Sequence, residues 1–169
     1  MKRLIWVLVA GALIVACQES EPVKSEFTGN ESVYALAQGS AYAINGTVSF
    51  KERLDGSTSV VVALSGTEGN VEHPVHLHLG DISSPDADVA ALLTPVNGVS
   101  GVSETKLERL ADETPITYAQ LISLDACVKI HLSASGPDRD IILAGGNIGA
   151  ASTREATSGR VGIAVCKSE

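Results

Sequence analysis

The sequence has 169 residues, with 20 acidic and 12 basic side chains and a formal net charge of −8. This length is typical of one domain, and 44% apolar against 19% charged residues supports a hydrophobic core, which excludes disorder of the whole chain. The acidic balance and the 4% of aromatic residues argue against a nucleic-acid partner, because phosphates attract basic patches and bases stack on aromatic rings.

The N-terminus has the pattern of a secretory signal. Lys2 and Arg3 precede an unbroken apolar run that is shorter than the roughly 20 residues of a membrane-spanning helix. The run ends in Ile-Val-Ala-Cys, which resembles the bacterial lipobox, whose cysteine becomes the lipidated first residue of the mature protein. We therefore expect a lipoprotein signal peptide over residues 1–16 and lipid on Cys17. The alternative is an ordinary signal peptide followed by a cysteine without a role.

The residues that follow Cys17 predict a location and a tether. Gln18 is not an aspartate, so by analogy with Gram-negative sorting we expect the outer membrane. Residues 17–30 are polar and acidic, as a solvated tether should be, and residues 31–169 form the predicted domain. Removal of the signal peptide would leave ten basic side chains against 20 acidic ones, a net charge of −10.

Beyond the tether, apolar residues alternate with polar ones or form short β-branched runs broken by turn residues. An Asp-Gly turn at residues 54–57 separates two such runs and predicts a hairpin. A short helical turn is predicted over Thr117–Leu124. We therefore expect an all-β fold, an immunoglobulin-like antiparallel sandwich or barrel of about eight or nine strands. The predicted strands are Ser32–Ala37, Ala43–Phe50, Thr58–Leu64, His73–Leu79, Asp88–Leu93, Ser103–Leu110, Ala126–Ser133, Asp140–Gly146 and Arg160–Cys166.

All four histidines lie in two of these predicted strands: His73, His76 and His78 in one, and His131 in the other. Successive side chains of a strand point to opposite faces, so His76 and His78 share a face, and apolar residues occupy the other. His131 and Lys129 likewise lie opposite an apolar face. We expect the apolar faces in the core and these histidines on the more polar faces, within reach of an ion or ligand.

Two imidazoles at positions i and i+2, with a third from a neighbouring strand, suit Zn²⁺ or Cu²⁺. The sequence therefore predicts His76, His78 and His131 as metal ligands, with His73, which lies off this parity, as a further candidate. The alternative is that the histidines form hydrogen bonds with one another, with the backbone or with nearby carboxylates. Whether the two strands are neighbours does not follow from the sequence.

Several segments resemble, in the same order, the chordin-type (CHRD) domains of bacterial envelope proteins. Residues 73–78 (His-Pro-Val-His-Leu-His) resemble the family's His-Pro-Ala-His-Ile-His, and residues 128–134 (Val-Lys-Ile-His-Leu-Ser-Ala) resemble its Ile-Asn-Val-His-Leu-Ser-Ala. Residues 145–149 (Gly-Gly-Asn-Ile-Gly) are similar to its Gly-Asp-Ile-Gly, with Asn147 in place of an aspartate. The likeness runs from about Tyr34 to Gly149 and implies an immunoglobulin-like domain whose biochemical role is poorly defined.

A second likeness concerns residues 76–81 (His-Leu-His-Leu-Gly-Asp), which resemble the copper-ligand strand of Cu,Zn superoxide dismutases. The dismutase pattern requires six histidine ligands, whereas this chain has four histidines. A copper-dependent redox protein is therefore only an alternative interpretation.

The cysteines divide into one anchor and one pair. With Cys17 assigned to the lipid, Cys127 and Cys166 remain in an oxidising compartment, and we expect a disulfide between them. The alternative is two buried thiols. No histidine is adjacent to either cysteine in sequence, and no Gly-x-Ser-x-Gly motif occurs, so no catalytic residue is predicted.

These features predict a non-catalytic, lipid-anchored protein of the bacterial cell envelope, with a CHRD-like binding or structural domain that holds Cu or Zn. The alternatives are a copper-dependent redox protein and an adhesion or assembly module without a metal. The predicted partners are the membrane, through the lipid, and an envelope protein whose identity the sequence does not give.

Overall fold

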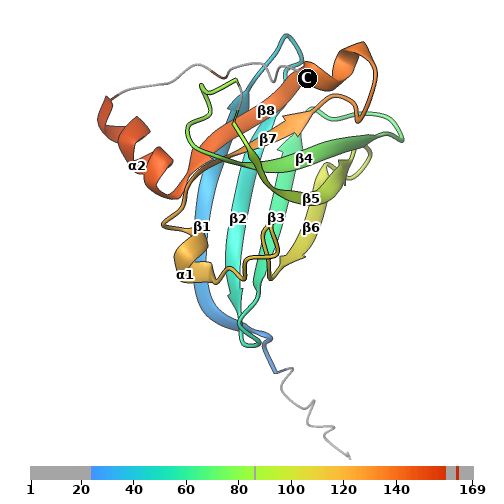
Figure 1. Ribbon diagram of the computed structural model, residues 1–169. Helices are drawn as coiled ribbons and strands as arrows, with labels where there is room; N and C mark the ends of the chain where they lie inside the picture. The colour runs from blue at the N-terminus through green and yellow to red at the C-terminus, as the bar shows by residue number, and fades with distance from the viewer. Residues whose placement is uncertain (1–23, 86, 159–162, 164–169) are drawn as a thin grey trace, which may run out of the picture.

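The computed structural model describes residues 24–85, 87–158 and 163, which form an antiparallel β structure (Figure 1). Two α-helices, α1 (Tyr118–Leu121) and α2 (Gly149–Ser158), and the 3-10 helix η1 (Pro137–Asp140) accompany the strands. The predicted all-β antiparallel sandwich or barrel is confirmed. The eight strands in the described residues are β1 (Phe27–Gln38), β2 (Asn45–Arg53), β3 (Thr58–Ser65), β4 (Glu72–Leu79), β5 (Val89–Asn97), β6 (Val102–Leu107), β7 (Asp125–His131) and β8 (Ile142–Ile148).

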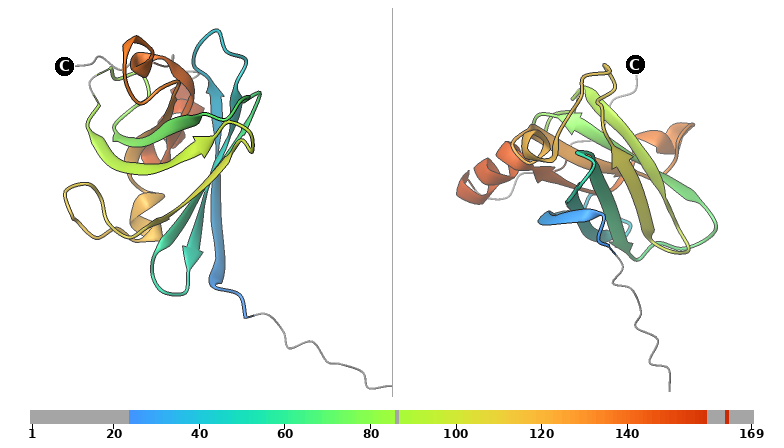
Figure 2. Two further views of the ribbon diagram at one scale, coloured as in Figure 1. Left: turned by 90° about the vertical axis from the view of Figure 1, so that its right-hand side faces the viewer. Right: turned by 90° about the horizontal axis from the view of Figure 1, so that it is seen from below.

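The strands follow the order β5-β4-β7-β8-β1-β2-β3-β6 in one sheet that bends into two layers (Figure 2). β1, β2, β3 and β6 form the first layer, and β8, β7, β4 and β5 form the second. The layers join where the end of β1 pairs with β8 over two residue pairs. On the other side, the Thr94 amide donates to Thr105 Oγ1 at 2.8 Å and links β5 to β6. The result is a nearly closed barrel-like sandwich.

The main core lies between the two layers and follows the alternation of the strands. Val48 and Phe50 of β2 and Val75 and Leu77 of β4 belong to this core, and all four side chains are buried. Burial of each such side chain contributes about 1.5–3 kcal/mol. The inward apolar faces predicted for the two histidine-bearing strands are confirmed for Val75, Leu77, Val128 and Ile130, whereas Leu79, at the end of β4, is exposed.

Several predicted boundaries differ from the structure. β1 begins at Phe27, ahead of the expected domain start at residue 31, and the predicted helical turn shrinks to the four residues of α1, capped by Thr117. Helix α2 was not predicted. The strand predicted over Arg160–Cys166 lies outside the described residues except for Ile163, which is not in a strand.

A second, smaller core covers the outer face of the layer that contains β4, β7 and β8. A Cβ placed on Gly145 would lie 2.9 Å from Ile82 Cδ1, so the segment after β4 packs directly on β8. Helix α2 packs on β7 and β8, where Ala151 is fully buried. The layer is therefore sandwiched between two packed regions. The buried apolar residues outside the main core are Ile82, Cys127, Ile142 and Ala151.

Candidate metal centre

The site begins with the pairing of β4 and β7. These strands are antiparallel neighbours, with His76 opposite Lys129 and His78 opposite Cys127. Since residues paired across a ladder point to the same face, His76, His78 and His131 share the outer face of the sheet. The two predicted histidine strands are thus adjacent, which the sequence alone left open.

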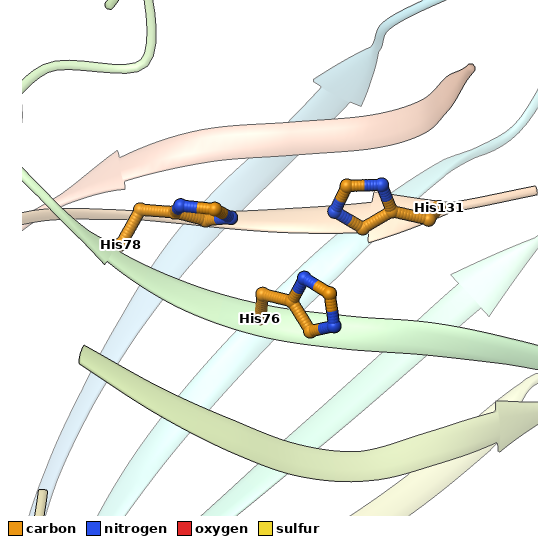
Figure 3. Close-up of side chains that lie close together, drawn as sticks. All are labelled: His76, His78 and His131. Atoms are coloured by element: carbon orange, nitrogen blue, oxygen red, sulfur yellow. The ribbon is translucent and has the colours of Figure 1, made fainter. Parts of the chain in front are cut away.

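The three imidazole rings lie close together and turn toward one another (Figure 3). The centroid of His76 is 4.5 Å from that of His131 and 5.7 Å from that of His78, and the remaining pair is 6.3 Å apart. One ring nitrogen from each residue lies within 4.8 Å of the other two. A tetrahedral ion bound about 2.0–2.1 Å from each nitrogen needs nitrogen–nitrogen separations of about 3.4 Å. Separations of up to 4.8 Å are longer than this, so the nitrogens must move closer together to bind one ion.

The ring nitrogens of His78 and His131 are oriented by the backbone. Nδ1 of His78 lies 2.8 Å from the carbonyl oxygen of Ala87, and Nδ1 of His131 lies 2.8 Å from that of Arg139. A carbonyl oxygen only accepts a hydrogen bond, so each Nδ1 carries the proton and donates it. In a neutral ring this leaves the lone pair on Nε2. A second hydrogen bond of this kind is typical of metal-ligating histidines.

The two Nε2 atoms are buried and have no hydrogen-bond partner. His78 and His131 are only 4% and 5% exposed, so water does not readily satisfy these nitrogens. Because buried polar atoms in folded proteins almost always have a partner, two unpartnered acceptors in one histidine group are compatible with a ligand such as a metal ion.

The electrostatics of the site favour neutral imidazoles. Burial, together with the neighbouring His131 and His78, lowers the pKa of His76 to about 4. Burial also lowers the pKa values of His78 and His131, with the charge of Lys129 acting in the same direction, although their carbonyl hydrogen bonds oppose the shift. Neutral rings are the form that binds metal ions, so the site is in its ligating state at neutral pH.

Lys129 is a charged neighbour whose burial was not predicted. Its side chain is fully buried beneath the segment after β4, where Nζ donates to the Ser84 carbonyl oxygen at 3.0 Å. The sequence already placed Lys129 on the same strand face as His131. Its burial depends on the second core, which no local pattern announced.

The structure does not bring His73 into the group. Its Nδ1 donates instead to the Leu132 carbonyl oxygen at 3.1 Å, a buried link between β4 and the end of β7. Asp81 is also outside the group and accepts hydrogen bonds from the Ser83 amide and hydroxyl at 2.9 and 2.6 Å, as in an Asx turn. Among the described residues, the candidate ligands are therefore His76, His78 and His131.

The expectation that the histidine face is open to an ion or ligand needs correction. Apart from half-buried His76, the face is covered by the second core, because the segment after β4 and the turn around η1 supply the carbonyl partners of His78 and His131. The site is partly enclosed and has one exposed side.

The predicted roles of the cysteines stay predictions. Cys127 is buried on the outer face of β7, opposite His78 in the ladder. Cys17 and Cys166 lie outside the described residues. The lipid on Cys17 and the Cys127–Cys166 disulfide therefore involve residues outside the described part of the chain.

No protein-family model matches the sequence, and a search of curated proteins found no match either. The resemblance to CHRD domains thus rests on the motifs quoted above. Within the described residues, no helix combines the length and apolarity needed to span a membrane.

Proposed function

We propose that this protein binds one Zn²⁺ or Cu²⁺ ion through His76, His78 and His131. The observation that carries the proposal is the pair of buried, unpartnered Nε2 atoms of His78 and His131. Their Nδ1 hydrogen bonds fix both rings in the tautomer that ligates through Nε2, and His76 supplies a third nitrogen within 4.8 Å.

The competing interpretation, a structural hydrogen-bonding cluster, fits these contacts less well. Such a cluster would use the second nitrogen of each ring, whereas Nε2 of both His78 and His131 has no partner. His73 fits that structural role instead, through its bond to the Leu132 carbonyl.

We further propose that the domain is anchored in the bacterial cell envelope by lipid on Cys17 and has a binding or structural role rather than a catalytic one. The lipobox-like segment and the CHRD-like motifs support this proposal. A bridged two-metal centre of the dismutase kind lacks ligands, since the whole chain has four histidines.

Isothermal titration of the purified protein with Zn²⁺ and with Cu²⁺ tests the metal site. We expect one ion per chain, and at least a hundredfold weaker binding when His76→Ala and His78→Ala are combined. His73→Asn is the matched control, because it changes a buried histidine outside the group and keeps a donor for Leu132. Unchanged affinity in the double variant would overturn the proposal.

Membrane fractionation tests the anchor. The full-length protein should partition into membranes, and Cys17→Ser should release it, because the variant lacks the thiol that carries the lipid. Cys166→Ser is the matched control and should stay with the membranes. A Cys17→Ser protein that still fractionates wholly with membranes would contradict the anchor.

A further inference from the structure

The turn between β7 and β8 is joined to the candidate metal site by a backbone hydrogen bond. It spans residues 132–141 and contains η1. At its base the Leu132 amide donates to the Ile141 carbonyl oxygen at 2.9 Å. Farther along, the Arg139 carbonyl oxygen accepts Nδ1–H of His131 at 2.8 Å. The second bond ties the backbone of the turn to a candidate metal ligand.

Side-chain packing holds this turn only weakly. Residues 134–139 are exposed, and no side chain of η1 is buried. Gly136, which precedes η1, has a φ of +76° and supplies no side-chain cap. The amides of Arg139 and Ile141 donate within the turn, at 3.3 Å to Gly136 and at 3.2 Å to Asp138. A segment with few buried contacts opens locally at a small cost in free energy, so the order of the turn depends on its bond to the histidine.

A metal ion on His131 would strengthen this bond. Nε2 of His131 is buried and has no hydrogen-bond partner, so it is the nitrogen that would bind an ion in the proposed site. A cation on Nε2 withdraws electron density from the ring, which makes the opposite Nδ1–H a stronger donor. Hydrogen bonds that involve an ionised partner are shorter and about twice as strong as neutral ones. Carbonyl partners of this kind also orient metal-ligating histidines and raise their affinity for the metal.

We infer that metal binding and the order of the η1 turn are coupled. An ion on Nε2 of His131 stabilises the turn through the Arg139 carbonyl, and the ordered turn raises the affinity for the ion. The two effects are equal in size by thermodynamic necessity. The inference rests on the proposed metal site and adds its regulation, because whatever orders or displaces this exposed turn changes metal affinity. The Arg139 carbonyl positions the ligand and does not itself bind the ion.

Hydrogen–deuterium exchange of the full chain, with and without Zn²⁺ or Cu²⁺, tests one direction of the coupling. The ion should slow exchange in the segment that contains the Arg139 and Ile141 amides by about threefold or more, because it makes local opening of the turn less frequent. The β2–β3 turn is the control, where the Gly56 amide donates to the Arg53 carbonyl at 3.1 Å. Its exchange should not change.

Two substitutions in the turn test the other direction, and neither changes a candidate ligand. Gly136→Ala strains a residue with positive φ, and Pro137→Gly loosens the start of η1. Each should weaken metal binding by about three- to tenfold in isothermal titration. Gly56→Ala is the matched control, because Gly56 and Gly136 both have positive φ and no atom within 4 Å of an added Cβ. It should leave metal affinity unchanged.

The outcomes separate this inference from the proposed function. A protein that binds the ion while exchange in the η1 turn stays the same overturns the coupling and leaves the metal site standing. Unchanged affinity in both Gly136→Ala and Pro137→Gly, or an equal loss of affinity in Gly56→Ala, also overturns the coupling. Failure of the parent protein to bind either ion would overturn the proposed function, and the coupling with it.

Discussion

The side-chain amide of Asn147 links β8 to the segment after β4 and to α2, through both its oxygen and its nitrogen. Its Oδ1 accepts the Ile82 amide at 2.8 Å, and its Nδ2 donates to carboxylate oxygens of Asp81 at 3.0 Å and Glu155 at 3.1 Å. An aspartate, the residue of the CHRD-like motif, could accept from Ile82 but would face two carboxylates. An asparagine, which accepts from Ile82 and donates to both carboxylates, therefore fits this position better than an aspartate.

This geometry predicts different costs for two substitutions of Asn147. Asn147→Ala leaves the buried Ile82 amide without an acceptor and should cost about 1–3 kcal/mol of unfolding free energy. Asn147→Asp keeps the acceptor but adds a third carboxylate, and should cost about 2–4 kcal/mol at pH 7. Urea denaturation at pH 7 and pH 5 separates the causes, since only the Asp variant should recover as its carboxyl protonates. An Asn147→Asp protein as stable as the parent at pH 7 would contradict the argument that the like charges repel.

His76 predicts how the stability of the metal-free protein depends on pH. Burial, with the charges of His131 and His78, lowers its folded-state pKa from 6.5 to about 4, and the pKa values of those two rings fall as well. Between these values the unfolded chain binds more protons than the folded one, so the free energy of unfolding falls as the pH is lowered.

We therefore expect the stabilisation from neutral His76 to be complete above about pH 6.5 and to be lost progressively toward pH 4. Urea denaturation of the metal-free protein at pH 7, 6 and 5 measures this slope. Lys129 is the partner of His76 in the β4–β7 ladder, and the charges of Lys129, Asp140 and Arg139 act on neighbouring His131. His76→Gln serves as the control and should flatten the curve. A parent protein equally stable at pH 7 and pH 5 would refute the prediction.

Among the elements, the turn from β8 into α2 depends on Gly149. Its φ of +54° lies in the left-handed region, and a Cβ there would clash with the Leu124 carbonyl oxygen. The Gly149 turn brings Ala150 N to the same carbonyl at 3.0 Å and starts the helix that covers β7 and β8. Close approach and positive φ thus coincide at one residue.

Gly149→Ala should therefore destabilise the protein by about 2–4 kcal/mol, more than positive φ alone explains. Gly56→Ala is the matched control, because Gly56 has a φ of +85° but no atom within 4 Å of the added carbon. Its expected cost is about 1 kcal/mol. Thermal and urea unfolding measure both variants, and equal losses would show that the contact with Leu124 is without consequence.

The elements that sequence patterns predict best are those whose pattern the main core requires. Residues 58–64 form a β-branched run and residues 73–79 alternate, as strands that place one face in that core do, and both strands are confirmed. Helix α2 escaped prediction because it buries little, Ala151 being its fully buried residue, and so has no periodic apolar stripe. Its existence depends on the second core rather than on a local signal.

For the candidate site, the sequence predicted the strand faces of the histidines but not how the strands meet. Parity placed His76 and His78 on one face and His131 opposite an apolar face, and the structure agrees. The meeting of these residues depends on the pairing of β4 with β7, about 50 residues apart, which no local pattern specifies. The hydrogen bonds to the carbonyl oxygens of Ala87 and Arg139 could not be predicted either, because backbone oxygens have no sequence signature.

For the whole molecule, a metal bound only by the folded state should raise its stability. His76 and His78 come from β4 and His131 from β7, so the three-histidine site exists only when these strands are paired. At a free Zn²⁺ concentration of 100 times the dissociation constant, binding should add about 2.7 kcal/mol. This corresponds to a rise in Tm on the order of 10 °C.

Differential scanning calorimetry with Zn²⁺, and then with excess EDTA, measures this effect. The rise should reverse with EDTA and be absent when His76→Ala and His78→Ala are combined, whereas His73→Asn should keep it. A rise that persists in the double variant would locate the stabilising ion elsewhere on the molecule.

Strand β7 has packed side chains on both of its faces. Six of its seven residues are buried. The side chains that face inward lie in the main core, and those that face outward lie beneath the second core. The two edges of the strand pair with β4 and β8. Its amide hydrogens can meet solvent only when both cores and both neighbouring strands separate. Deuterium uptake at β7 should therefore follow the rate and free energy of global unfolding, while the segment after β4 exchanges through smaller local openings.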